Sequence, residues 1–359
     1  MHINWKHLAI ALAVLPFVVL LAAWIGFFNV GASAGHWKIT EWFLHFAMRS
    51  AIRTYALTVE VPEKLPREAI QPAAAHFARG CAICHGAPGE ARSPAVLQML
   101  PQPPDLTTVV NDWTDAELFR IVKHGVRFTG MPAWPVQTRD DEVWAMVAFL
   151  RELPAMPTGE YRNLAHGRNM PAWNPAGFEA VVVECALCHG DDGRSRSPMT
   201  PIIAGQSETY LLESLRAYAR GDRPSGFMSL PATAADSQTF AGLARHFATL
   251  QPAGPTENPD VELAGKGEAI ARNGLRARNI PACLSCHGDD NRNLLYPSIA
   301  GQSAGYIQGQ LKLFRMGNRG GTPYSHIMIK VAEGLSDADI AALAAHFSRL
   351  PWPPRKRAD

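Results

Sequence analysis

The chain contains three copies of the pattern Cys-x-x-Cys-His, and together they use all six of its cysteines. Two thiols separated by two residues and followed at once by an imidazole are the attachment pattern of c-type haem: the sulfurs bond to the porphyrin and the histidine binds the iron. We therefore predict three covalently bound haem c groups. The attachment residues are Cys81, Cys84, Cys185, Cys188, Cys283 and Cys286, and the iron-binding histidines are His85, His189 and His287.

Other uses of paired cysteines fit this pattern less well. A structural zinc site usually takes two such pairs, which would leave one of the three pairs unused. A thioredoxin-like motif belongs to a βαβ pattern, whereas the surroundings here read as helical and rich in Pro and Gly. Disulfides across two-residue gaps would be strained and would give the adjacent histidines no role.

The nearly even spacing of the three motifs along 359 residues indicates three domains. Each is small for a self-sufficient core, so a buried macrocycle would supply apolar mass that the chain lacks. The formal net charge of +2 gives no indication of nucleic-acid binding or of an acidic substrate. The predicted haem domains are 66–157, 158–253 and 254–354, with short linkers near 154–159 and 252–259 and a basic tail at 355–359.

The first 35 residues contain an uncharged stretch, Leu8 to Phe28, that is long enough to span a bilayer as a helix. The apolar part of a signal peptide is typically about 7–15 residues long, and this stretch is longer. The length favours a membrane anchor formed by residues 1–35. A cleaved signal is the alternative, because Ala32-Ser33-Ala34 resembles a cleavage site. Either segment directs export, so we expect the haem domains in the bacterial periplasm, on a single-pass anchor in the inner membrane.

Residues 36–65 are predicted to form a stalk, with an amphipathic helix over 36–57. The N-terminal half of this helix holds four aromatic residues: Trp37, Trp42, Phe43 and Phe46. They follow the apolar stretch closely, and aromatic rings favour the membrane interface. Packing of the helix on the first haem domain is an equal alternative.

The second and third domains are duplicates of each other. The matched segments are 203–207 with 299–303, 210–221 with 306–317, and 238–250 with 338–350. The first domain follows the plan more distantly, with Thr114 as the N-cap of its middle helix. Each domain reads as a helix into the haem motif, a Pro/Gly-rich loop, a middle helix, a loop with Met and a last helix. The predicted fold class is all-α, with three tandem domains after one transmembrane helix.

The second axial ligand separates an electron carrier from a catalyst. Methionine opposite histidine fills both axial positions and raises the potential, whereas an open position permits ligand binding or catalysis. The duplication selects among the eleven methionines, because Met228 and Met328 stand in register. In the first domain Met131 lies between Gly130 and Pro132, which would hold its sulfur on a stiff segment. We predict Met131, Met228 and Met328 as the distal ligands.

The remaining candidates lack this support. Four methionines are unsuitable by position or have no counterpart in the duplicate: Met99, Met146, Met199 and Met316. His246 and His346 pair in register on the last helices and would give bis-His ligation, although core or surface histidines are commoner there. His326 is the alternative to Met328 in the third domain.

Three loops are expected to orient the proximal histidines. A proximal histidine usually donates its free ring N–H to a carbonyl, which fixes the orientation and basicity of the ring. Pro201 and Pro297 correspond across the duplication, with Pro104 as their equivalent in the first domain. These loops lie where the acceptor should be.

With these residues the chain resembles class I cytochromes c repeated three times. Residues 158–354 resemble the di-haem periplasmic cytochromes c through the two IAGQS segments and the last helix at 335–347. Residues 66–157 resemble the single-haem modules of respiratory oxidases and dehydrogenases through VKHGVRFTGMPAW at 122–134. The resemblance implies a small helical bundle around each haem and histidine–methionine axial pairs.

The function that this resemblance implies is electron transfer. We expect a membrane-anchored periplasmic tri-haem cytochrome between a respiratory donor and a terminal oxidase or other acceptor. Its partners would be redox proteins, such as a quinol-oxidising complex or a dehydrogenase, and no small-molecule substrate is expected. One alternative is the cytochrome subunit of a periplasmic alcohol or sugar dehydrogenase complex. Another is a haem peroxidase with one open haem site.

Overall fold

The computed structural model describes residues 5–31, 34–167, 177–252, 259–288 and 293–352. In these ranges the chain is helical and forms no β-strand, only isolated bridges between Ala87 and Glu90 and between Leu275 and Ile280. The all-α prediction is confirmed. The predicted basic tail, most of the 252–259 linker, and Ala32 and Ser33 of the candidate cleavage site lie outside the described residues.

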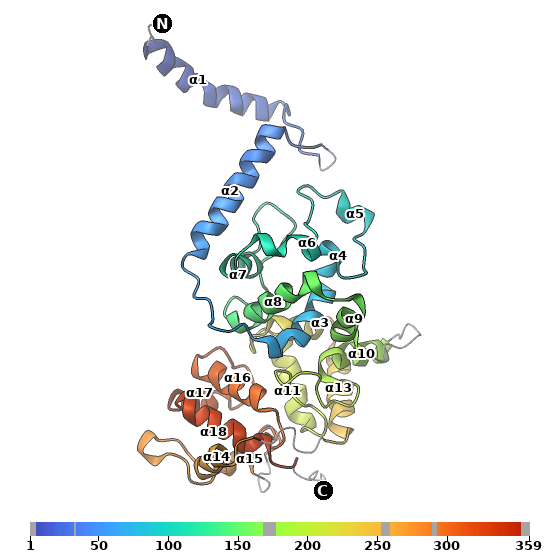
Figure 1. The fold of residues 1–359 in the computed structure, drawn as a ribbon, viewed down its shortest axis with the longest axis vertical. Coiled ribbons are helices and arrows are strands. Elements are labelled where there is room, and N and C mark those ends of the chain that lie inside the picture. The colour runs from blue at the N-terminus through green and yellow to red at the C-terminus, as the bar shows by residue number, and fades with distance from the viewer. Residues whose placement is uncertain (1–4, 32–33, 168–176, 253–258, 289–292, 353–359) are drawn as a thin grey trace.

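Helix α1 (Trp5–Trp24) is apolar, has no buried residue and projects away from the rest of the molecule (Figure 1). Its 20 residues, at about 1.5 Å each, span about 30 Å, the thickness of the hydrocarbon core of a bilayer. Length and composition therefore fit a membrane span, and a signal sequence would fit the same description.

Helix α2 (Lys38–Ala56) connects α1 to the helical body (Figure 1). Its C-terminal half packs on the first domain: the Arg49 guanidinium lies 4.5 Å from the ring centre of Trp113, and Arg120 lies 4.8 Å from that of Tyr55. The four aromatic residues of its N-terminal half are exposed. The C-terminal half of α2 therefore contacts the first domain, whereas the aromatic residues at its N-terminal end are exposed.

The first hydrophobic core forms between α3 (Ile70–Gly80), α7 (Asp115–His124) and α8 (Asp140–Glu152). Thr114 caps α7 as predicted, because its hydroxyl accepts the Glu117 N–H while the Glu117 carboxylate accepts the Thr114 N–H. The short elements of this domain are η1 (Arg67–Ala69), α4 (Ala82–His85), α5 (Pro94–Leu97), α6 (Leu106–Val109), η2 (Val110–Asp112) and η3 (Leu153–Ala155).

Helix α9 (Thr158–His166) packs on α3 and completes the first core, with Tyr161 and Ala165 fully buried. The sequence interpretation treated 154–159 as a linker and began the second domain at 158. This segment instead contributes to the first core, because Leu153, Tyr161 and Ala165 are buried against α3 and α8. The boundary at 157/158 therefore separates α9 from the core it belongs to.

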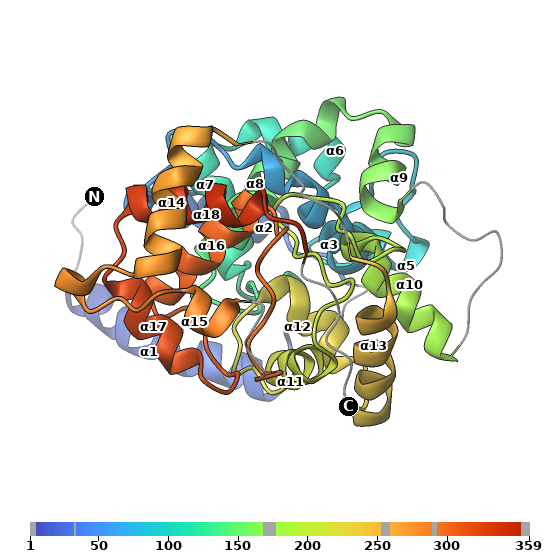
Figure 2. The same ribbon diagram turned by 90° about the horizontal axis from the view of Figure 1, so that it is seen from below.

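The duplication is visible in the order of helices in the second and third domains, which lie side by side (Figure 2). The second domain contains α10 (Gly177–His189), α11 (Glu208–Ala219), α12 (Gly226–Thr233) and α13 (Ser237–Thr249). The third contains α14 (Val261–Asn273), η4 (Arg276–Arg278), α15 (Leu284–His287), α16 (Ala304–Arg315), α17 (Ser325–Glu333) and α18 (Asp337–Ser348).

Two details of the predicted plan are corrected. Met228 and Met328 lie in the first turns of helices α12 and α17 rather than in loops. In the third domain the helix before the haem motif ends at Asn273, because Gly274 takes φ +65° and leads into a tight turn that returns to it. A Cβ on Gly274 would lie 2.2 Å from the Ile280 carbonyl oxygen, so only glycine fits there.

Candidate haem sites

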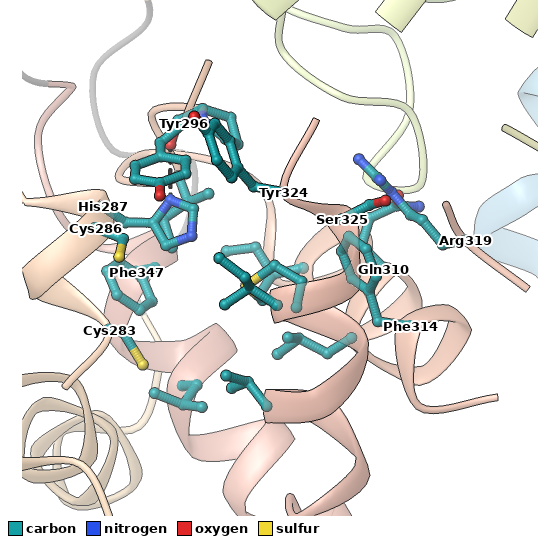
Figure 3. A pocket seen from close by; sticks show the side chains of 18 of the residues that line it. Cys283, Cys286, His287, Tyr296, Gln310, Phe314, Arg319, Tyr324, Ser325 and Phe347 are labelled. Atoms are coloured by element: carbon teal, nitrogen blue, oxygen red, sulfur yellow. Dashed lines mark hydrogen bonds between the residues drawn. The ribbon is translucent and has the colours of Figure 1, made fainter. Parts of the chain in front are cut away.

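The third site is a cavity lined by its whole predicted set of residues: Cys283, Cys286, His287 and Met328. Figure 3 shows His287 and the two cysteines on one wall, with Gln310, Phe314 and Arg319 across the cavity. His287 Nδ1 lies 2.9 Å from the carbonyl oxygen of Pro297. Burial lowers the pKa of His287, with the hydrogen bond to Pro297 opposing this, so the imidazole is neutral and Nε2 is available to a metal.

The second site has the same design. Cys185, Cys188, His189 and Met228 line one cavity, and His189 Nδ1 lies 3.0 Å from the carbonyl oxygen of Pro201. Burial lowers the pKa of His189 and raises that of the Cys185 thiol to about 12, so both groups are neutral in this cavity. Met199, which the sequence interpretation discounted, lines the same cavity.

At the first site His85 Nδ1 lies 2.8 Å from the carbonyl oxygen of Pro104. The predicted acceptors are thus confirmed in all three domains. Met131 lies in a compact loop between α7 and α8, where the Val126 N–H donates to its carbonyl at 3.3 Å and its own N–H donates to Thr129 Oγ1 at 3.1 Å.

The first site has a further methionine nearby, Met99, which the sequence analysis set aside because of its position. The Met99 methyl group lies against Gly130, at 2.6 Å from the position that a Cβ on that glycine would take. Met99 is therefore close to the Met131 loop in space, although the middle helix separates the two in sequence. Met146 is buried in the core, and Met316 is exposed.

The histidine alternatives lie away from the two cavities. His246 and His346 line neither cavity, and His346 is buried against Phe347 and the backbone near Gly267. His326 is exposed and does not line the third cavity, whereas Met328 two residues later does. The placement of these side chains favours the methionines as ligands.

Sequence reasoning missed a pair of buried arginines between the second and third domains. Arg223 and Arg319 are 5% and 6% exposed, and neither has a carboxylate partner among the described residues. Arg319 lines both cavities and donates to the Tyr210 hydroxyl at 3.0 Å, while its Nη1 is buried without a partner. The available signal was their matching position after the duplicated middle helices.

These arginines test whether haem suits the cavities. A buried guanidinium without a carboxylate partner is unfavourable unless an anion balances its charge. Haem supplies two carboxylates besides its apolar ring, and the cavity walls are otherwise largely apolar side chains. The residues present therefore fit the group that the Cys-x-x-Cys-His motifs predict.

Two glutamines link the second and third sites reciprocally. Gln302 binds the backbone of Ile202, accepting its N–H at 3.0 Å and donating to its carbonyl at 2.6 Å. Gln206 binds Ser298 in the same way, at 3.0 and 2.9 Å. Ile202 and Ser298 directly follow the prolines whose carbonyls face His189 and His287. Each domain therefore fixes the loop that orients the other domain's histidine.

Comparison with known proteins agrees with this geometry. Residues 68–150 match the family model described as cytochrome c oxidase, cbb3-type, subunit III. Cytochrome c4 from Azotobacter vinelandii is 35% identical over 199 residues, which cover 52% of this chain and 92% of that protein. The thiosulfate dehydrogenase electron acceptor of Thiomonas intermedia is 35% identical over 191 residues, 51% of this chain and 88% of that protein.

A solved structure, that of reduced cytochrome c4 from Pseudomonas stutzeri, is 32% identical and covers 49% of this chain and all of its own, with a TM-score of 0.44. From the sequence matches, the protein is a c-type cytochrome, a class of haem-bearing electron carriers. More narrowly, the chain belongs to the family that includes the di-haem cytochromes c4.

Proposed function

We propose that this chain binds three haem c groups and relays electrons in the periplasm between a respiratory donor and a terminal oxidase or other acceptor. The observation that carries the proposal is the repetition of one arrangement in three places. Each Cys-x-x-Cys-His motif has its histidine Nδ1 within 3.0 Å of a proline carbonyl. We infer the axial pairs His85–Met131, His189–Met228 and His287–Met328.

The chain's own residues would set how each haem behaves. Haem iron, when bound, accepts and releases one electron. The proline carbonyls hold the histidine rings and raise their basicity, which tunes the potential. The cysteines fix the ring covalently, and the apolar walls exclude water from it. We propose three haem domains at 66–157, 158–253 and 254–354, in which α9, at the start of the second range, packs on the core of the first domain.

We further propose that α1 anchors the protein in the inner membrane of a bacterium, with the haem domains in the periplasm. The span-length apolar helix and the exposed aromatic residues that begin α2 support this arrangement. If α1 is an anchor, mass spectrometry should find residues 1–35 in the mature protein, and alkaline carbonate should not extract the protein from membranes. A mature chain that begins after residue 34 and washes off would identify α1 as a signal sequence.

A second function is favoured by one specific finding. The similarity to a thiosulfate dehydrogenase electron acceptor supports a role as the cytochrome subunit of a periplasmic dehydrogenase complex. The two proposals differ only in the donor. Purified protein reduced stoichiometrically by a co-purifying dehydrogenase would favour the complex, and reduction by a quinol-oxidising complex would favour the relay.

An absorption and magnetic circular dichroism spectrum with and without carbon monoxide tests the relay itself. We expect three low-spin haems per chain with a methionine–iron charge-transfer band and no change on adding carbon monoxide. A high-spin haem that binds carbon monoxide in the unmodified protein would contradict the axial pairs and would favour the peroxidase alternative.

A further inference from the structure

A buried carboxylate joins the first domain to the second. Glu142, on α8 of the first domain, is 2% exposed. Its Oε1 accepts the Ser225 hydroxyl at 2.6 Å, and its Oε2 accepts the Gly226 N–H at 2.6 Å and the Trp134 Nε1–H at 3.2 Å. Three donors therefore converge on one carboxylate, and two of them come from the start of α12.

Arg139 completes this cluster. Its Nη1 lies 3.0 Å from Glu142 Oε1 and donates to the Pro224 carbonyl at 2.7 Å. The first domain therefore holds three consecutive residues, Pro224 to Gly226, immediately before and within the first turn of α12. Arg139, Glu142 and Met228 also line the same cavity as His189.

The contact is too close for any side chain at position 226. A Cβ on Gly226 would lie 2.4 Å from Trp134 Nε1 and 2.9 Å from Glu142 Oε2. The next residue, Phe227, packs its ring 5.6 Å from that of Trp134 and 5.2 Å from that of His76. Met228 follows directly, and Trp134 lies three residues after Met131. The segments that carry the two predicted distal ligands thus meet at this contact.

The duplication provides an internal comparison. In register, Gly226 corresponds to His326 and Phe227 to Ile327 in the third domain, and both of these are exposed. Helix α17 there has no side-chain cap, whereas Ser225 caps α12 by accepting the Met228 N–H at 3.2 Å. The glycine and the phenylalanine ring packed on Trp134 therefore occur only in the copy that the first domain covers.

We propose that Glu142, together with Arg139, positions Met228, so that the first domain controls the distal ligation and the potential of the second haem. This inference rests on the proposed function, in which Met228 is that ligand. Met228 lies one turn from the bound segment, so movement of Pro224 to Gly226 moves its sulfur. Removing one partner of a buried charged cluster leaves the others unsatisfied, which favours such movement.

The test compares full-length Glu142→Gln with the unmodified protein. Gln keeps the shape of the side chain but replaces an acceptor with a donor that faces other donors. Reduced-state NMR resolves the shifted methyl resonance of each iron-bound methionine, and Met228→Ala identifies the resonance of the second haem. We expect Glu142→Gln to shift or remove that resonance and to move the potential of that haem alone, with three haems retained by mass.

Asp140→Asn is the matched control. Asp140 is a nearby carboxylate on α8 that is half exposed and pairs with Lys123, and among the described residues it has no hydrogen bond or ion pair with Arg139 or α12. It should leave all three resonances unchanged. If Glu142→Gln fails to accumulate, Gly226→Ala serves instead, because its Cβ cannot fit against Trp134 and it should give the same selective shift.

Three outcomes overturn the proposal: unchanged resonances in the Glu142 or Gly226 variant, equal shifts at all three haems, or an Asp140 variant that matches Glu142→Gln. Failure of the proposed function has a different signature. The unmodified protein would then carry fewer than three haems, or Met228→Ala would remove no resonance, whatever the Glu142 variant does.

Discussion

In each Cys-x-x-Cys-His motif the histidine ring is oriented by the backbone carbonyl of a proline that lies later in the chain. Pro104, Pro201 and Pro297 accept from His85, His189 and His287 at 2.8 to 3.0 Å. A proline lacks a donor of its own, and its ring keeps the backbone direction fixed. The carbonyl is therefore a rigid acceptor, and it selects the tautomer that leaves Nε2 for iron.

The distal side of the first site has a second methionine near the predicted ligand, because Met99 lies against the Met131 loop. We predict that Met131→Ala opens one axial position, so that the protein binds one carbon monoxide per chain where the unmodified protein binds none. Met99→Ala should bind none. Optical titration of the reduced proteins with carbon monoxide measures this difference. The opposite result, with binding only in the Met99 variant, would reassign the ligand.

Among the elements, α3 and α12 contribute an aromatic cluster to the contact between the first and second domains. His76 of α3 packs against the rings of Trp134 and Phe227, with centroids 4.8 and 5.2 Å away. Burial lowers the pKa of His76 to about 4 from its ordinary 6.5. The ring is therefore neutral in the folded protein at every pH where an unfolded chain would begin to protonate it.

This predicts an acid-sensitive contact. Because the folded pKa is the lower one, the stabilisation is complete above about 6.5 and is lost as the pH falls toward about 4. The free energy of unfolding should fall by about 3 kcal/mol at the acid end of this range, because each unit of pKa difference contributes about 1.4 kcal/mol. His76→Phe should remove this part of the pH dependence. Calorimetric unfolding of both proteins between pH 4.5 and 7.5 measures it, and parallel curves would contradict the assignment to His76.

Across the whole molecule, the second and third domains orient each other's histidines. Gln302 is 3% exposed and holds the backbone beside Pro201, while Gln206 holds the backbone beside Pro297. A haem site in this pair is therefore incomplete without the neighbouring domain. We expect such an arrangement to couple the potentials of the two proposed haems without contact between them.

We predict that Gln302→Leu raises the potential of the second haem, because a looser Pro201 carbonyl makes His189 a less basic ligand. The size should be about 40 mV, since a hydrogen bond contributes about 1 kcal/mol and a tenfold change in a one-electron equilibrium is about 59 mV. Gln206→Leu should shift the third haem instead. Redox titration with each haem resolved tests this, and identical effects of the two variants would refute the reciprocal link.

The sequence by itself determined the local chemistry of this protein. Cys-x-x-Cys-His is a contiguous pattern, so the attachment residues needed no fold to be located. By register alone, the duplication selected Met228 and Met328 as candidate ligands and located the two proline acceptors. Helix class and caps such as Thr114 are likewise local, because they depend on spacing and on side chains within one turn.

Only the tertiary structure decided what lies between the domains. Tyr161 packs in the first core rather than in the second domain. The sequence around it did not indicate this, because the residues that bury its ring are distant along the chain. Glu142 and Arg319 resemble surface charges in sequence, and their burial becomes tolerable only where another domain supplies donors or a bound group supplies an anion. The same holds for Gly226: an ordinary glycine in sequence, it is required because Trp134 of another domain occupies the space that a side chain would take.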